Sequence, residues 1–185
     1  LFAQDVLKIE KPSIALLNIG SEDVKGSPAI QEAHHILRGS VKLNYKGFIE
    51  GHELMNGCVD VIVADGFAGN IALKTMEGTA SYIKIALEEA FSASLLTRLG
   101  YCIVKPIFDK YREKYNPRKF NGAPFLGLDG IAVKSHGGAD EVAFASAIGV
   151  AVDMVHRKIN DHIRQELEKW KKETVLTESV NGVSF

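Results

Sequence analysis

The 185-residue chain has few of the features of secreted, membrane-spanning or nucleic-acid-binding proteins. Its two cysteines, Cys58 and Cys102, are too few for a disulfide framework and favour a reducing compartment. No apolar run approaches the roughly 20 residues needed to cross a bilayer. A net charge of −1 gives no electrostatic support for binding nucleic acid. We therefore expect a cytoplasmic protein without nucleic acid among its partners.

Several catalytic signatures are also missing from the sequence. There is no GxGxxG dinucleotide fingerprint, no GxxxxGK[ST] phosphate loop and no GxSxG nucleophile elbow. The six histidines are scattered, and His156 and His162 are six residues apart, which places them on different faces of a helix. These absences argue against a dinucleotide-binding dehydrogenase, a serine hydrolase and a metal site. The chain also begins at Leu1 rather than Met, so we expect it to be a piece of a longer protein.

The remaining composition is typical of a globular domain, with 46% hydrophobic and 24% charged residues. Hydrophobic patterning alternates between strands and helices, which predicts an α/β layered domain over residues 1–172 and a frayed tail over residues 173–185. The predicted strands are residues 13–18, 41–48 and 61–64, with a hairpin in residues 121–136 that turns at Asp129-Gly130. Residues 1–10 read as the end of a helix that Pro12 stops, and Ser27 caps a predicted helix over residues 28–38. A short helical turn is predicted at residues 53–55. Two long helices, over residues 70–91 and 95–115, form a predicted helical hairpin in which Pro106 kinks or divides the second helix, and the last predicted helix covers residues 139–172.

Three glycine-rich junctions, at residues 18–26, 65–70 and 134–140, each follow a predicted strand and precede a predicted helix. In an open α/β sheet such junctions lie along the carboxyl edge, where ligands bind. The apolar run 61–64 reads as a strand buried on both faces, and the N–H groups of the helix start after it favour an anion. Backbone donors, lysine, an amide and an imidazole suit phosphate better than a metal.

Each candidate residue also has a structural interpretation. Asp65 and Asn70 could cap a helix, and the acids at positions 22 and 23 could be turn residues. Lys25 could be a solvated lysine and His136 a hydrogen-bonded loop histidine. The long helix 70–91 is apolar over much of its circumference, which predicts that it is buried or shared with a partner.

Three segments, LLNIGSEDVKG, VDVIVADGFAGNIALKTMEG and FNGAPFLGLDGIAVKSHGGAD, resemble in that order the bacterial phosphate acyltransferases of the PlsX type. The resemblance covers about residues 10–165 and corresponds to the second half of that family, whose members are roughly twice this length. It implies part of a three-layer α/β/α Rossmann-like sandwich, similar to phosphate acetyltransferases and isocitrate-type dehydrogenases.

The resemblance implies an acyltransferase that moves a fatty acyl group from acyl carrier protein to inorganic phosphate, giving acyl phosphate for phospholipid synthesis. It implies a homodimer without cofactor or metal, in peripheral contact with the inner face of the cell membrane. The catalytic residues that it implies are Lys25, Asn70, His136 and Asp65. The phosphate-binding residues are Gly20, Ser21, Gly66, Gly69, Ser135 and Gly137.

Two other functions stay open. The chain could be a dimerisation, carrier-protein-binding or membrane-docking module without activity, or a short-chain acyltransferase that uses coenzyme A. The helix over residues 95–115 carries apolar and basic side chains together. It could be a dimer or core helix with a solvated basic face, or an element that lies on an anionic membrane surface.

Overall fold

The computed structural model describes residues 1–181, with side chains placed through residue 172. The chain is a mixed α/β protein with a parallel sheet and flanking helices, as predicted for part of an α/β/α sandwich. It divides into two compact units, of which one is Glu10–Arg112 and the other combines Leu1–Ile9 with Glu113–Phe185. None of the helices in the described residues is long and apolar enough to cross a membrane.

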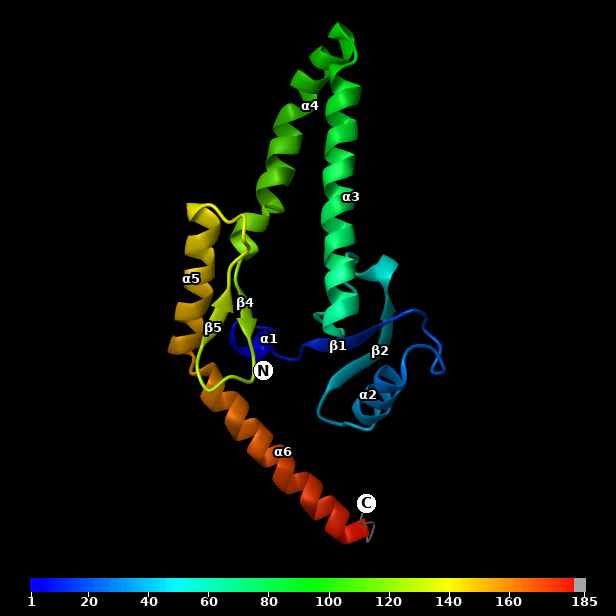
Figure 1. Ribbon diagram of the computed structural model, residues 1–185, viewed down its shortest axis with the longest axis vertical. Coiled ribbons are helices and arrows are strands. Elements are labelled where there is room, and N and C mark those ends of the chain that lie inside the picture. The colour runs from blue at the N-terminus through cyan, green and yellow to red at the C-terminus, as the bar shows by residue number, and fades with distance from the viewer. Residues whose placement is uncertain (182–185) are drawn as a thin grey trace. The chain divides into compact units, whose positions relative to one another are not determined.

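The Glu10–Arg112 unit contains a three-stranded parallel sheet in the order β2-β1-β3 (Figure 1). Ala15, Leu16 and Ile49 on the two first strands form its buried core, and helix α2 packs against β1 and β2. Pairing with β1 sets where β2 begins, because Ser13 at the start of β1 pairs with Asn44. The elements are β1 (Ser13–Asn18), α2 (Pro28–Arg38), β2 (Asn44–Glu50), the 3-10 turn η1 (Gly51–Glu53) and β3 (Val61–Val63).

Most predictions for this part of the sheet are confirmed, with shifts at the ends of elements. Strand β1 has the predicted bounds, and Ser27 caps α2 by accepting the Ile30 N–H at 3.4 Å. Strand β2 starts and ends later than predicted, and the helical turn η1 precedes the predicted one. The prediction that the 61–64 strand is buried on both faces is wrong. Among the described residues β3 pairs with β1 alone, at the edge of the sheet, and Val63 is 45% exposed.

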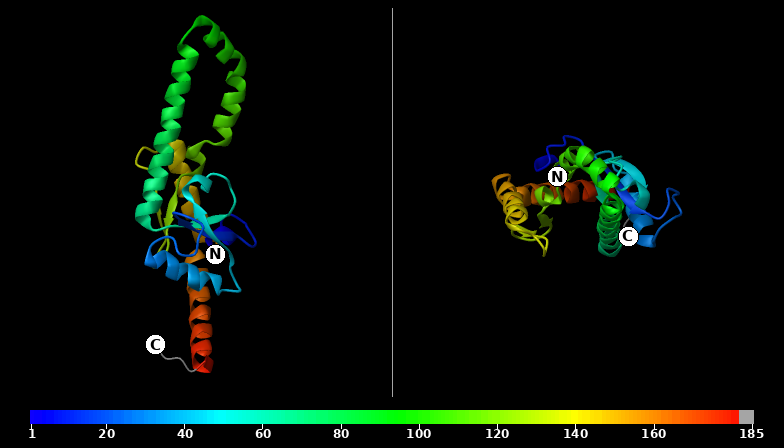
Figure 2. Two further views of the ribbon diagram at one scale, coloured as in Figure 1. Left: turned by 90° about the vertical axis from the view of Figure 1, so that its right-hand side faces the viewer. Right: turned by 90° about the horizontal axis from the view of Figure 1, so that it is seen from above.

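Two long helices, α3 (Gly66–Ser92) and α4 (Leu95–Lys114), follow β3 and form the predicted helical hairpin (Figures 1 and 2). Ser94 at the turn donates its N–H to Thr97 Oγ1 at 3.0 Å and accepts the Thr97 N–H at 3.1 Å, which caps the start of α4. The ring of Phe91 on α3 packs against two rings of α4, those of Tyr101 and Phe108. Helix α4 continues through Pro106 and is not divided there.

The hairpin helices leave many apolar side chains exposed. None of the residues of α3 or α4 is buried. Of the two alternatives predicted for α3, burial within the described chain is therefore wrong, and contact with a partner stays a prediction. The exposed apolar residues include Ile71, Leu73, Ile83, Ile85 and Leu87 on α3, and Leu95, Leu96, Leu99, Ile103 and Ile107 on α4.

The second unit is built around a helix that covers a short antiparallel hairpin. Helix α5 packs on both strands of the hairpin and on a 3-10 turn, and Ala143, Ala147, Met154 and Ile159 are buried. Its elements are α1 (Phe2–Asp5), η2 (Pro117–Phe120), β4 (Ala123–Phe125), β5 (Ala132–Lys134), α5 (Glu141–His156) and α6 (Ile159–Asn181). Helix α1 is held to this unit because the Arg157 guanidinium donates to the Asp5 carbonyl oxygen.

Three predictions for this unit are wrong. The connection between β4 and β5 spans residues 126–131, so Asp129-Gly130 is not a two-residue turn. The region predicted as one last helix forms two, α5 and α6. The helix is interrupted at Arg157 and Lys158, where Lys158 has a left-handed φ of 50°. The frayed tail over residues 173–185 stays a prediction: α6 runs through Asn181, and residues 182–185 lie outside the described residues. Helix α1 ends at Asp5, well before Pro12, which therefore does not stop it.

Candidate functional site

The parallel sheet brings two of the three glycine-rich junctions to one edge. Leu16 of β1 pairs in parallel with Val63 of β3, so both strands end at the same edge, as predicted for a ligand-binding site. The loop of residues 19–27 leaves the sheet there, and α3 begins there after only Ala64 and Asp65. The end of β2 lies at the same edge, because Asn18 pairs with Glu50.

The loop after β1 is held by a buried amide. Asn18 is 5% exposed, and its Nδ2 donates to the Lys25 carbonyl oxygen at 3.1 Å while its Oδ1 accepts the Ile19 N–H at 2.9 Å. Gly26 has φ +93°, and a Cβ atom there would lie 2.3 Å from Asn18 Oδ1. Only glycine fits both the conformation and the space. Asn18 and Gly26 thus fix the backbone of Lys25, whose side chain is exposed.

The other predicted residues of this loop differ in their surroundings. Gly20 is buried, and a Cβ atom there would lie 2.6 Å from Glu22 Oε2. Ser21 is exposed in a bend. The Lys25 N–H donates to the Glu22 carbonyl oxygen at 2.9 Å, which closes a turn over residues 22–25. The loop is therefore a compact turn that presents Ser21 and Lys25 to solvent.

The second junction is a helix start and not a loop. Asp65 is the N-cap of α3, and its Oδ1 accepts the N–H groups of Phe67 and Ala68, both at 2.9 Å. The Gly69 N–H donates to the Asp65 carbonyl oxygen at 2.9 Å. Three of the N–H groups expected to bind an anion therefore already have acceptors within the chain.

The positions of the remaining residues of this junction follow from that helix start. Gly66 is the first residue of α3 and Asn70 the fifth, so Asn70 does not cap the helix. The Asn70 side chain is exposed. The capping interpretation of Asp65 is confirmed, and its side chain orders this part of the edge.

The third junction belongs to the second unit. Strand β5 pairs with β4 in a separate two-stranded sheet, so the argument that placed residues 134–140 at the edge of the parallel sheet does not apply to them. Asn121 organises this junction. Its Nδ2 donates to Ser135 Oγ and to the Ala143 carbonyl oxygen, both at 2.8 Å, and its Oδ1 accepts the His136 N–H at 2.9 Å.

The same junction fixes the tautomer of His136. Its Nδ1 atom lies 3.1 Å from the Gly138 N–H and accepts that hydrogen bond. A neutral imidazole that accepts at Nδ1 carries its proton on Nε2. His136 is exposed, as is Gly137 in the adjacent turn. The loop therefore offers an N–H donor to solvent.

The most important contacts of both junctions come from residues that the sequence did not single out for a role. Asn18 and Asn121 each end or precede an apolar stretch, and both lie inside the segments that carry the family resemblance. Asn18 could have been recognised from its position, because it is a polar residue at the end of an apolar strand. Nothing in the local pattern separates Asn121 from an ordinary loop asparagine.

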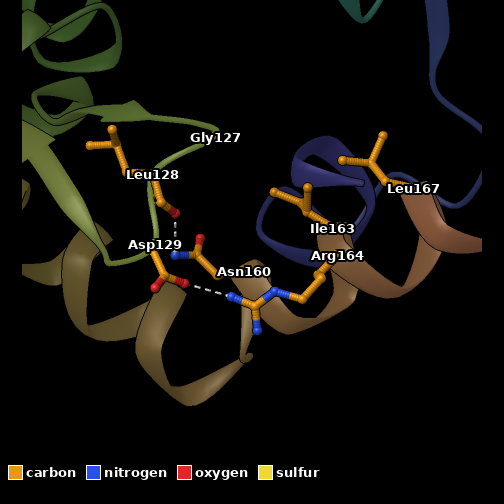
Figure 3. Close-up of a pocket in the computed structure, with 7 residues that line it drawn as sticks. All are labelled: Gly127, Leu128, Asp129, Asn160, Ile163, Arg164 and Leu167. Atoms are coloured by element: carbon orange, nitrogen blue, oxygen red, sulfur yellow. Dashed lines mark hydrogen bonds and ion pairs between the residues drawn. The ribbon is translucent and has the colours of Figure 1, made fainter.

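A small pocket in the second unit contains none of the predicted site residues. It has a volume of about 250 Å³ between the β4–β5 connection and α6 (Figure 3). Arg164 Nη2 pairs with Asp129 Oδ1 at 2.7 Å, and Asn160 Nδ2 donates to the Leu128 carbonyl oxygen at 3.2 Å. These interactions tie α6 to the connection, and they occupy the polar groups of the pocket.

Comparisons with known proteins agree with the resemblance seen in the three segments. A phosphate acyltransferase of Paramagnetospirillum magneticum is 50% identical over 172 residues, which is 92% of this chain and 49% of that protein. One from Rhodospirillum centenum is 50% identical over 91% of this chain and 48% of its own length. One from Agrobacterium fabrum is 46% identical over 90% of this chain and 48% of its own length.

The chain thus spans about half the length of the relatives it matches. A family model described as "Fatty acid synthesis protein" matches residues 1–162. The chain therefore belongs to this fatty acid synthesis protein family.

Proposed function

We propose that the chain is part of a phosphate acyltransferase that transfers a fatty acyl group from acyl carrier protein to inorganic phosphate. The observation that carries the proposal is the shared sheet edge, where the Lys25 loop and the start of α3 meet at the ends of β1 and β3. The Lys25 cation at this edge suits a phosphate anion, whereas the N–H groups of residues 67–69 at the start of α3 already donate to Asp65. The names of the relatives and the family membership support the same reaction.

In the proposed step a phosphate oxygen attacks the thioester carbonyl carbon. The new C–O bond forms as the C–S bond breaks, and the products are acyl phosphate and the free thiol of the carrier protein. Phosphate is already anionic near neutral pH, so it needs little help from a general base. What remains for the protein is to position the two reactants, which contributes up to about 7–11 kcal/mol, and to stabilise the oxyanion.

The residues divide between these tasks. Lys25 supplies positive charge to phosphate or to the oxyanion, and Asn70 donates a hydrogen bond. Asp65 orders the start of α3 by capping it. His136 carries its N–H on Nε2 and is suited to donate a hydrogen bond to the leaving sulfur. We also propose phosphate contacts at the backbone of residues 20, 21 and 66 in the Glu10–Arg112 unit, and at residues 135 and 137 in the second unit. The Gly69 N–H, also predicted to bind phosphate, already donates to the Asp65 carbonyl oxygen.

Substitution of Lys25 in the full-length protein tests this assignment. We expect Lys25→Ala to lower acyl-phosphate formation at least tenfold, with a changed dependence on phosphate concentration. Lys46→Ala is the matched control, because Lys46 is an exposed lysine on β2 away from the loop. Unchanged turnover and unchanged phosphate dependence for Lys25→Ala would contradict the proposed role.

Two further experiments separate the alternatives. Phosphate-dependent release of free carrier protein from acyl carrier protein, assayed with this chain alone, distinguishes a complete enzyme from a docking or dimerisation module. Turnover with acetyl-coenzyme A but not with a long-chain acyl carrier protein would identify a short-chain acyltransferase.

The exposed apolar residues of α3 and α4 support two further contacts, a homodimer and a peripheral contact with an anionic membrane. Leu99 is 67% exposed near the turn of the hairpin, and α4 also carries basic residues that can meet lipid headgroups. We expect Leu99→Glu to weaken co-sedimentation with vesicles that contain anionic lipid. Leu73→Glu is the control, since Leu73 lies at the other end of the hairpin. Equal binding by wild type and Leu99→Glu would exclude this surface.

A further inference from the structure

One face of α2 holds the loop that carries Lys25. Gln31, His34 and Arg38 are three and four residues apart, so they lie on the same side of the helix. Gln31 Nε2 donates to the Val24 carbonyl oxygen at 2.9 Å and to that of Gly26 at 3.4 Å. Arg38 Nη1 pairs with Asp23 Oδ2 at 2.8 Å. Two of the three side chains thus bind the loop directly.

The third side chain, His34, is enclosed between α2 and β2. It is 12% exposed, and its ring stacks on Phe48 with a centroid distance of 4.4 Å. Its Nδ1 lies 2.7 Å from Tyr45 Oη. Its Nε2 is buried, makes no hydrogen bond to any described residue, and lies 3.5 Å from Asp23 Oδ1. A buried nitrogen without a hydrogen bond beside a carboxylate needs an explanation.

The neighbours of His34 determine where its proton lies. A bare Nε2 lone pair facing the Asp23 carboxylate would be repelled, so the neutral ring carries its proton on Nε2 and accepts the Tyr45 hydroxyl at Nδ1. Burial, and then the charge of Asp23, raise the pKa of Tyr45, which keeps this hydroxyl protonated. Protonation of His34 would add a positive charge 3.5 Å from Asp23 and turn a weak contact into an ion pair.

We propose that His34 is a positioning residue, whose protonation tightens its contact with Asp23 and so orders the loop that carries Lys25. Among the described residues, the ionisable groups that face His34 are Asp23 on the loop and Tyr45 on β2, and Arg38 on α2 holds the other oxygen of Asp23. Asp23 and Lys25 belong to the same turn, which the Lys25 N–H closes onto Glu22. A change at Asp23 therefore reaches Lys25 through a short, hydrogen-bonded segment.

The role of His34 in ordering the loop does not depend on what Lys25 binds. Its consequence for phosphate binding rests on the proposed function of Lys25. Loop order is highest below the range in which histidines titrate and falls as the pH rises through it. If Lys25 binds phosphate, the same rise in pH increases the KM for phosphate in the full-length protein, with little change in kcat. A residue that merely packs would not give this separation.

A pH titration of the ¹⁵N-labelled chain by nuclear magnetic resonance, from about pH 5.5 to about pH 8, tests the positioning role. We expect the amide signals of Val24 and Lys25 to shift with one midpoint, and this midpoint to disappear in His34→Gln and in Asp23→Asn. His35→Gln is the matched control, because His35 is the exposed neighbour of His34, and it should titrate as wild type does. Titration of Val24 and Lys25 that persists in His34→Gln would overturn the proposal.

A second measurement keeps the proposal testable if His34→Gln does not fold. In Asp23→Asn the amide signals of Val24 and Lys25 should no longer change together with the ring signals of His34, because the carboxylate that links the ring to the loop is gone. Loop signals that still follow the ring would refute the coupling. If the loop titrates as expected but Lys25→Ala leaves turnover intact, the proposed role of Lys25 fails while the positioning role of His34 stands.

Discussion

The sharpest prediction concerns Gly26, where a single methyl group meets two separate obstacles. Its φ of +93° is a conformation that other residues rarely adopt, and the added Cβ atom would lie 2.3 Å from Asn18 Oδ1. The conformational cost is about 1–3 kcal/mol. Displacing the buried Asn18 amide from its two hydrogen bonds costs about 1–3 kcal/mol more. We therefore expect Gly26→Ala to lower the free energy of unfolding by about 2–6 kcal/mol.

Urea unfolding followed by circular dichroism measures this loss, and a second substitution divides it. In an Asn18→Ala background the clash is gone, so Gly26→Ala should then cost only the conformational part. Gly78→Ala on α3, where a Cβ atom meets open space, is the control and should stabilise by about 0.5–1 kcal/mol. A loss at Gly26 below about 0.5 kcal/mol, or the same loss with and without Asn18, would refute the reasoning.

Two further predictions concern acid stability and the second unit. Hydrogen bonds from the Ser13 hydroxyl and N–H lower the pKa of Asp60. The stability that ionised Asp60 contributes is therefore present above the ordinary aspartate pKa and is lost as the pH falls through the lowered pKa. Asp60→Asn should lower the urea midpoint at pH 6, and the difference from wild type should shrink in acid; a difference that does not shrink would contradict this role of Asp60. Asn121→Ala removes three hydrogen bonds and should cost about 2 kcal/mol in the same assay. This is more than the loss expected for Ser135→Ala, which removes the bond from Asn121 and a long one of 3.5 Å to the His136 carbonyl oxygen; equal losses would show that Asn121 does not organise the loop.

Local signals predicted the elements of the first unit well. Ser27-Pro28 and Gly39 mark both ends of α2, and an uninterrupted apolar run marks β1. The start of α3 was placed four residues late because glycines were taken as loop residues, although Asp65 caps the helix before them. The ends of β2 are set by its pairing with β1, and a local sequence pattern carries no information about which residues of another strand will pair with it.

Long-range contacts explain most of the remaining differences. Asp129-Gly130 has the composition of a tight turn, but Arg164 and Asn160 of α6 hold the longer connection around it. No glycine or proline marks the break at Lys158, where α6 leaves the direction of α5. For the site, the segments that hold Lys25 and His136 could be identified from the sequence, but the asparagines that fix them could not, since their role depends on partners far along the chain.

The two-residue link between β3 and α3 has a mechanical consequence. A helix of 27 residues is about 40 Å long, and Asp65 caps its first turn with only Ala64 between it and β3. A rotation of about 5° at that first turn moves the far end of the helix by about 3.5 Å. A small change in the angle between β3 and α3 therefore becomes a displacement of several ångströms at the turn of the helical hairpin.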